Sequence, residues 1–231
     1  MTKAEKKRRI DEVTLRLKSI YPDAECALEY GGDPWRLLVM ARLSAQCTDA
    51  RVNIVSRELF LRFPTARAMA DGELSEIEQI IKPCGLYKMK AKNLKDSSAE
   101  LCDKYGGKLP DTMEELLTLS GVGRKIANLL LGDIFGKSAV VCDTHCMRIC
   151  ARLGMYPQAL KNPTKIEYIL KELLDPEESS DFCHRIVMFG RDYCTARSPQ
   201  CCRCPIFDLC RYKEKKDENC GKEKGKIAYN S

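Results

Sequence analysis

The sequence predicts an all-α protein, and two observations carry this prediction. Apolar residues recur every three or four positions over long stretches, which is the spacing that places them on one face of a helix. Proline, asparagine, aspartate and glycine stand where helices begin and end. Only residues 139–142 look extended, and that segment is too short for a sheet. We therefore expect helices joined by short loops.

Three helices are predicted in the first half of the chain. The first carries one apolar stripe on a charged segment, made up of Ile10, Val13, Leu17 and Ile20. The second begins at Asp33-Pro34, an N-cap followed by proline at the first helical position, and contains the apolar run 35–43. The third ends at Gly106-Gly107, and its stripe consists of Ala91, Leu94, Ser98, Leu101, Cys102 and Tyr105.

A helix, a tight turn and a second helix are predicted over residues 112–136. Thr112-x-x-Glu115 is a capping box before a short helix. That helix runs into the turn Gly121-Val122-Gly123. The helix after the turn should end at Gly136, and the residues expected to face inward are Ile126, Leu129 and Leu130. Two later helices are expected to start at Asn162-Pro163 and in the segment 175–178.

Composition narrows the class of protein. The 231 residues include 39 lysines and arginines against 33 acids, a net charge of +6 that suits a polyanionic partner without requiring one. No apolar run approaches the roughly 18 residues of a membrane span, and the charged N-terminus lacks the apolar core of a signal peptide. We expect no membrane partner and a cytoplasmic or nuclear location. Residues 214–231 are predicted to form a disordered basic tail.

The turn Gly121-Val122-Gly123 has the features of a phosphate-binding site. A glycine turn that opens a helix exposes backbone N–H groups to an anion, and Lys125 follows two residues after the second glycine. A neutral lysine amine could attack a sugar C1′, displace a damaged base and form an iminium that permits loss of the 3′ phosphate. A plain helical hairpin turn, with Lys125 as a phosphate-binding charge, is the alternative.

Asp143 lies eighteen positions after Lys125, between the extended segment and a helical run. Its ordinary interpretation is an N-cap. A carboxylate there could also stabilise an oxocarbenium-like sugar or help to activate the amine. The two roles are compatible, because a side chain that caps a helix is held in a fixed position.

Four of the fourteen cysteines are spaced as metal ligands. Cys194, Cys201, Cys204 and Cys210 give the pattern C-x6-C-x2-C-x5-C. Such a group in a chain without an export signal predicts bound metal, and either zinc or a [4Fe-4S] cluster could accept it. The long first gap favours iron–sulfur. Cys202 is interpreted as a bystander, with a competing ligand as the alternative, and most of the remaining cysteines as small buried hydrophobes.

These motifs together resemble endonuclease III, the bifunctional DNA glycosylase and AP lyase family of the helix-hairpin-helix superfamily. The residues that carry the resemblance are Leu119–Lys125, Val141–His145, the four cysteines, Leu43–Asp49 and Gly85–Ala91. It covers nearly the whole chain except the tail.

The resemblance implies a role for each matched residue. Lys125 would be the Schiff-base nucleophile and Asp143 its acidic partner, while the four cysteines would hold a [4Fe-4S] cluster. Gln46 would fill the gap left by an extruded base, and Leu86 would wedge into the opposite strand; unstacking a base costs a few kcal/mol, which inserted side chains partly offset. The further DNA contacts implied are Gly121, Gly123, Arg124 and His145.

The implied fold has two helical domains that flank a DNA-binding cleft. One is a six-helix barrel domain over 27–137 with the helix-hairpin-helix, and the other is an iron–sulfur domain built from 1–26 and 138–213. Ser120 replaces the proline usual in the family, and we expect it to loosen the turn. The expected partner is double-stranded DNA with damaged bases or abasic sites, bound by a monomer near the nucleoid or in a nucleus.

Three functions compete at this point. The first is base excision of oxidised pyrimidines followed by β-elimination, as the resemblance implies. The second is a non-catalytic iron–sulfur protein that binds DNA or senses redox state, and the third is a soluble electron carrier. Lys125 favours the first, because relatives without lyase activity generally lack a lysine there.

Overall fold

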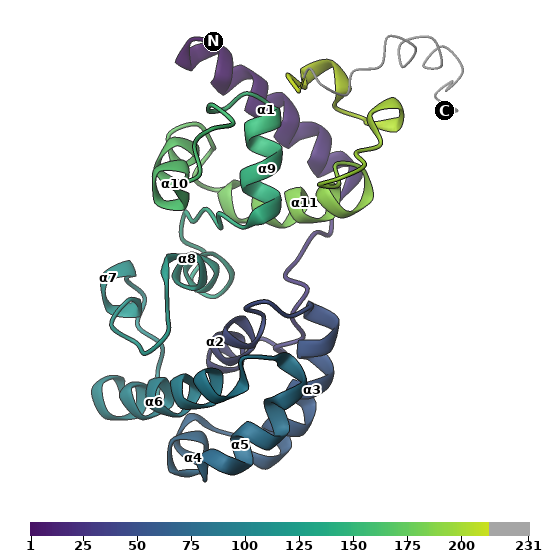
Figure 1. Ribbon diagram of the computed structural model, residues 1–231. Helices are drawn as coiled ribbons and strands as arrows, with labels where there is room; N and C mark the ends of the chain where they lie inside the picture. Colours follow the sequence, from purple (N-terminus) through teal and green to yellow (C-terminus); the bar gives the residue numbers. More distant parts are fainter. Residues whose placement is uncertain (213–231) are drawn as a thin grey trace. The chain divides into compact units, whose positions relative to one another are not determined.

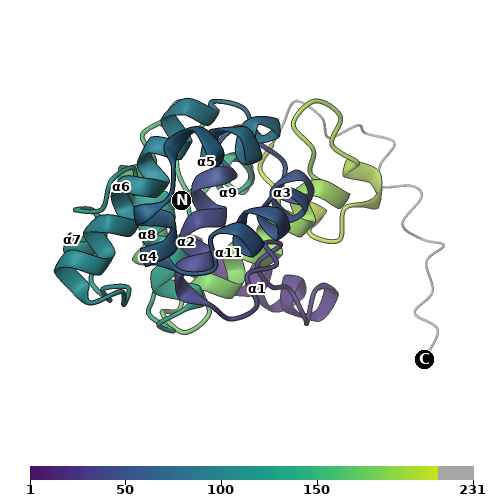
Figure 2. The same ribbon diagram turned by 90° about the horizontal axis from the view of Figure 1, so that it is seen from below.

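A computed structural model describes residues 1–212, and every regular element in that range is helical. The all-α prediction is confirmed. The chain divides into two compact units: Cys26–Lys137 forms one, and Met1–Glu25 together with the chain from Ser138 onward forms the other. Figures 1 and 2 show their helices from two directions. The predicted tail 214–231 lies outside the described residues.

The 26–137 unit is built around α6, its longest helix at 19 residues, which packs against α4 and α5 (Figure 1). Its elements are α2 (Pro34–Leu43), α3 (Asp49–Arg62), α4 (Ala66–Asp71), α5 (Leu74–Ile81), the 3-10 turn η1 (Lys82–Cys84), α6 (Tyr87–Tyr105), α7 (Met113–Leu116) and α8 (Arg124–Asp133).

The predicted capping signals define several of these helices. The Asp33 carboxylate accepts hydrogen bonds from the N–H groups of Trp35 and Arg36, so α2 begins at Pro34 as expected. Gly106 ends α6 in the left-handed region at φ +59°. The buried indole of Trp35 donates to Ser98 Oγ at 3.2 Å, which joins α2 to α6 through the apolar face that the sequence predicted.

The other unit joins the N-terminal helix to the C-terminal half of the chain. Its elements are α1 (Lys3–Ile20), α9 (Thr144–Arg152), α10 (Pro163–Lys171), α11 (Ser179–Asp192), η2 (Cys201–Arg203) and η3 (Phe207–Leu209). The predicted stripe of α1 is buried at Ile10, Val13 and Leu17. These side chains belong to one core with apolar residues of α9, α10 and α11.

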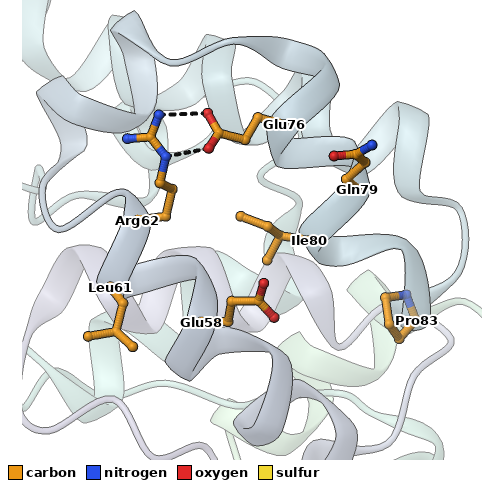
Figure 3. A pocket seen from close by; sticks show the side chains of 7 residues that line it. All are labelled: Glu58, Leu61, Arg62, Glu76, Gln79, Ile80 and Pro83. Atoms are coloured by element: carbon orange, nitrogen blue, oxygen red, sulfur yellow. Dashed lines mark hydrogen bonds and ion pairs between the residues drawn. The ribbon is translucent and has the colours of Figure 1, made fainter.

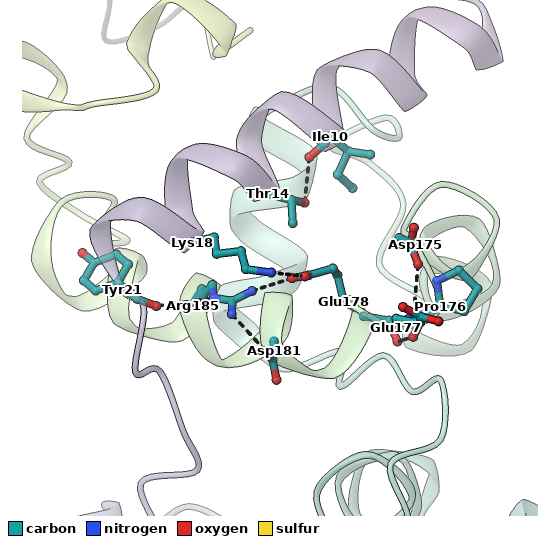
Figure 4. A network of polar contacts seen from close by, with 11 residues as sticks. Ile10, Thr14, Lys18, Tyr21, Asp175, Pro176, Glu177, Glu178, Asp181 and Arg185 are labelled. Carbon is teal, nitrogen blue, oxygen red and sulfur yellow. Dashed lines mark hydrogen bonds and ion pairs between the residues drawn. The ribbon is translucent and has the colours of Figure 1, made fainter.

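A buried arginine fastens α1 to α11 (Figure 4). Arg185 is 3% exposed and donates to Glu178 at 2.8 Å, to Asp181 at 2.9 Å and to the carbonyl of Tyr21 at 3.4 Å. Lys18 of α1 pairs with the same Glu178 carboxylate. This network holds the ends of two helices that are far apart in the sequence.

Some predicted elements differ from the structure. The sequence patterns did not locate α3, α4 or α5. On α8 the buried residues are Ala127, Asn128, Leu130 and Leu131, whereas Ile126 and Leu129 are half-buried. The helix expected from residue 175 begins at Ser179, because the Asp175 carboxylate accepts from Glu177 N–H and closes a turn first. No helix among the described residues has the length and apolarity needed to span a membrane.

Candidate functional site

The hairpin turn between α7 and α8 leaves a helix N-terminus open to an anion. Gly121 has φ +72°, a left-handed conformation that glycine adopts without penalty. Gly123 is the N-cap of α8, with φ −102° and no side-chain capping bond. A Cβ added to Gly123 would meet nothing within 4 Å. The backbone N–H groups at this end of α8 therefore lack a side-chain cap, as a phosphate site requires.

Two side chains brace this turn from within the same unit. Arg42 of α2 donates to the carbonyl oxygen of Gly121, and its guanidinium occupies the space that a Cβ on Gly121 would enter. Burial lowers the pKa of Arg42. Ser120 donates to the Glu100 carboxylate twice, through N–H at 2.6 Å and through Oγ at 2.7 Å. The serine therefore anchors the turn, and the expectation that it would loosen the turn is wrong.

Lys125 lies in the first turn of α8 with its side chain exposed. Within residues 26–137, no carboxylate forms an ion pair with its amine, and the preceding Arg124 is half-buried. The amine thus stands beside the uncapped helix end, where a bound phosphate would place a sugar within reach.

Gln46 and Leu86 share an unusual backbone conformation. They are the only non-glycine residues among the described ones with positive φ, at +53° and +50°. Both side chains are exposed, and Leu86 is 49% exposed. Residues other than glycine persist in the left-handed region only where the surrounding structure enforces it, and such strain clusters at functional sites. The structure therefore singles out, by a separate criterion, the two residues that the resemblance assigned to DNA insertion.

Asp143 is the N-cap of α9 in the other unit. Its Oδ1 accepts from the N–H of Cys146 at 2.7 Å, and its Oδ2 lies 3.0 Å from Nδ1 of His145. The two side chains are 14% and 26% exposed. The carboxylate is thus held rigidly by two contacts and still reaches solvent.

The four predicted cysteine ligands lie in a segment of consecutive tight turns after α11. All four are half-buried. Burial raises the pKa of Cys204 to about 12, and the charges of Cys194, Cys210 and Cys201 act in the same direction, so the four lie within electrostatic range of one another.

Arg152 of α9 organizes this segment. Its guanidinium donates to Cys194 Sγ at 3.1 Å, to the carbonyl of Thr195 at 2.8 Å and to that of Ala196 at 3.1 Å. A second N–H, from Tyr212, points at Cys210 Sγ at 3.4 Å.

Donors aimed at sulfur suit thiolate ligands, and four thiols match the donor set of an iron–sulfur cluster. Among residues 1–212, no three His, Cys, Asp or Glu side chains converge as the ligands of one metal ion would.

A groove of about 630 Å³ lies between α3 and α5 (Figure 3). Leu61, Gln79 and Ile80 are among its lining residues, and none of the predicted site residues lines it. The cation in its wall, Arg62, pairs with Glu76. The groove therefore does not complement a phosphate.

The predicted site residues fall into two groups. The hairpin, Lys125, Gln46 and Leu86 belong to the 26–137 unit, whereas Asp143, His145 and the cysteines belong to the other. Sequence reasoning missed Arg42 and Lys90. Lys90 had a signal that could have found it, because it precedes Leu94 by four positions and therefore lies on the apolar face of α6.

Known proteins resemble the chain over most of its length. Residues 39–176 match the HhH-GPD superfamily base excision DNA repair protein family. Endonuclease III of Synechocystis sp. is 43% identical over 208 residues, which cover 90% of this chain and 94% of the relative. Endonuclease III of Escherichia coli K12 is 36% identical over 206 residues, covering 89% and 96%.

Solved structures agree with the sequence relatives. A non-covalent endonuclease III–DNA complex superposes with a TM-score of 0.84 and 40% identity, covering 92% of this chain and 96% of that one. A trapped covalent endonuclease III–DNA intermediate gives the same TM-score and identity. The family resemblance found in the motifs is confirmed. The chain belongs to the endonuclease III family, within the HhH-GPD superfamily of base excision DNA repair proteins.

Proposed function

We propose that this chain is a bifunctional DNA glycosylase and AP lyase that removes oxidised pyrimidines from duplex DNA and cleaves 3′ to the resulting abasic site. The observation that carries the proposal is the exposed Lys125 amine in the first turn of α8, beside the uncapped Gly123. In this arrangement the turn binds a phosphate and the amine meets the adjoining sugar. We also propose that the protein acts on DNA in the cytoplasm and that it does so as a monomer.

The chemistry divides into a glycosylase step, which releases the base, and a lyase step, which breaks the strand. Lys125 Nζ attacks C1′, the bond from C1′ to the damaged base breaks, and the base leaves with a proton. Opening of the sugar ring gives an iminium between Nζ and C1′. Loss of a proton from C2′ then expels the 3′ phosphate by breaking the C3′–O bond, and water hydrolyses the iminium to restore the lysine.

The remaining predicted residues support these steps. Asp143 stabilises the cationic sugar in the transition state, with its position held by the cap and by His145. Gln46 and Leu86 occupy the space vacated by the extruded base. Gly121, Gly123 and Arg124 contact the phosphate backbone, and such contacts carry no base sequence.

The cysteines are assigned to a [4Fe-4S] cluster. Cys194, Cys201, Cys204 and Cys210 would hold it, and Arg152 would stabilise the ligand loop. When bound, the cluster would hold this loop in its folded conformation, and it would take no part in bond breaking.

Product analysis tests the proposed activity. A 5′-labelled duplex with one thymine glycol should yield a strand break without alkali, because the lyase step follows base release. Base release with breakage only after alkali would contradict the lyase step. Binding to the lesion without base release would favour a non-catalytic DNA-binding or redox-sensing protein.

The cofactor has its own test. The purified protein should absorb visible light in the blue and contain iron and sulfide in equal amounts. Replacing any one of the four cysteines by serine should abolish both, whereas Cys202→Ser should retain them. Stoichiometric zinc without sulfide would overturn the cluster.

A further inference from the structure

Lys90 is a buried lysine to which neither proposed step assigns a role. Its side chain lies on α6 and is 1% exposed. The amine donates to two backbone carbonyls, those of Leu43 and Cys84, each at 2.8 Å. Among the described residues, no carboxylate forms an ion pair with it. Burial lowers the pKa of Lys90, because an ammonium group loses water there. A buried charge of this kind is costly and persists only with well-placed acceptors.

The two carbonyls belong to the two segments that carry the left-handed residues. Leu43 is the last residue of α2 and precedes Gln46 by three positions. Cys84 ends η1 and precedes Leu86 by two. The end of α2 is the negative end of the helix dipole, which favours a cation bound to its last carbonyls.

Two further interactions involve the same segments. The backbone N–H of Lys90 donates to the carbonyl of Leu86 at 3.0 Å, so one residue holds the Leu86 turn through both its backbone and its side chain. The thiols of Cys47 and Cys84 also influence each other: burial, and then Cys47, raises the pKa of Cys84 to about 11. Cys47 follows Gln46 directly. The loop of Gln46 and the turn of Leu86 are therefore tied together beneath their exposed side chains.

We propose that Lys90 is a positioning residue for base extrusion, which fixes the Gln46 loop and the Leu86 turn relative to each other so that both side chains enter the duplex together. The inference rests on the proposed glycosylase function. It predicts that Lys90 matters where a base must leave a stacked duplex, and not for the reaction of Lys125 with a sugar that is already accessible.

Lys95 provides a matched control on the same helix. Its amine also donates to two backbone carbonyls, those of Ala70 at 2.7 Å and Gly72 at 2.6 Å. These carbonyls lie at the end of α4, away from the Gln46 and Leu86 segments in the chain. Lys90→Met and Lys95→Met therefore remove the same kind of contact from two places.

The test compares two substrates at a temperature where all variants are folded by circular dichroism. One is a thymine-glycol duplex, assayed for single-turnover base release; the other is a single-stranded oligonucleotide with an abasic site, assayed for cleavage. Lys90→Met should lose ~10-fold or more on the duplex, a tenfold change being about 1.4 kcal/mol of barrier, and stay within about 2-fold on the single strand. Lys95→Met should stay within about 2-fold on both.

Equal losses on both substrates would overturn the proposal, and so would an unchanged duplex rate. If Lys90→Met does not fold, Lys90→Leu, which also removes the amine, replaces it under the same criteria. A parent chain that cleaves neither substrate would instead refute the proposed function.

A double-mutant cycle checks that Lys90 acts through the inserted side chain. Leu86→Ala should reduce the duplex rate less in the Lys90→Met background than in the parent, because the leucine is already misplaced there. Fully additive losses would show that Lys90 acts independently of Leu86 and would overturn the positioning role.

Discussion

The Asp143 carboxylate holds two partners at once: Oδ1 accepts from the Cys146 N–H that begins α9, and Oδ2 lies 3.0 Å from Nδ1 of His145. The capping role predicted from local sequence is present, and it leaves one carboxylate oxygen directed at a histidine. One side chain can therefore cap a helix and also take part in the reaction.

Substitutions at Asp143 separate these two roles. Asparagine caps helices as well as aspartate does, so Asp143→Asn should change the free energy of unfolding by less than about 0.5 kcal/mol while slowing base release ~100-fold. Asp143→Ala should also lose about 1 kcal/mol of stability. Denaturant titration and single-turnover kinetics measure the two effects. If the Asp143→Asn variant releases the base at the parental rate, Asp143 serves only as a helix cap and has no role in the chemistry.

The two hairpin glycines should respond in opposite ways to alanine. Gly121→Ala should destabilise the protein by about 1–2 kcal/mol, because a side chain is strained at φ +72° and its Cβ would enter the space that the Arg42 guanidinium occupies. Gly123→Ala has open space and should fold normally. Its methyl group should nevertheless weaken DNA binding, since it stands where a phosphate approaches. Thermal unfolding and a duplex binding titration test the pair; a stable Gly121→Ala variant would contradict the first half.

The Ser120–Glu100 contact should be worth about 1 kcal/mol to the hairpin. Glu100→Gln replaces one acceptor oxygen with an amide that cannot accept from Ser120, and Ser120→Ala removes the hydroxyl donor. Their destabilisations, measured by denaturant unfolding, should be less than additive in the double variant. Strict additivity would mean that the two residues do not interact in solution.

Acid should weaken the junction of α1 with α11. Hydrogen bonding from Lys18, and then from Arg185, holds the pKa of Glu178 below its ordinary value of 4.5. A lowered folded-state pKa stabilises the protein above the unfolded-state value, and this stability is lost as pH falls through the folded-state pKa. Glu178→Gln should therefore flatten the decline of melting temperature below about pH 4.5.

The exposed pair of Glu172 with Lys3 is the control for this effect. Glu172 also has a lowered pKa through its lysine partner, but both side chains are mostly exposed. Glu172→Gln should therefore change the decline of melting temperature at acid pH less than Glu178→Gln does. Identical profiles for the two variants would argue against a special role for the Arg185 network.

Helix ends marked by aspartate-proline or by paired glycines were predictable, whereas helices without strong periodicity were not, although the Thr48 and Thr65 side chains cap α3 and α4. Asp33 and Gly106 mark α2 and α6 in the sequence as in the structure. By contrast, α3 exposes Ile54 and Leu61, at 68% and 85%, which blurs its apolar stripe. Short helices such as α4 offer too few turns for a period to show.

The candidate site was predictable where spacing alone defines a motif. The cysteine pattern and the Gly121–Lys125 turn are of this kind. Arg42 and Lys90 were missed because a cation on a helix ordinarily faces water, and only the fold shows that each reaches a backbone carbonyl. The left-handed conformation of Gln46 and Leu86 also escapes the sequence, because neither residue type favours it.

The most direct test of the central claim is borohydride trapping with Lys125. If Lys125 forms the iminium, reduction of a reaction with a thymine-glycol or abasic duplex should link the DNA covalently to the protein. Lys125→Gln should give no such product although it still binds the duplex. An intact protein that yields no cross-link, or a Lys125→Gln variant that yields one, would contradict the assignment of Lys125 as the nucleophile.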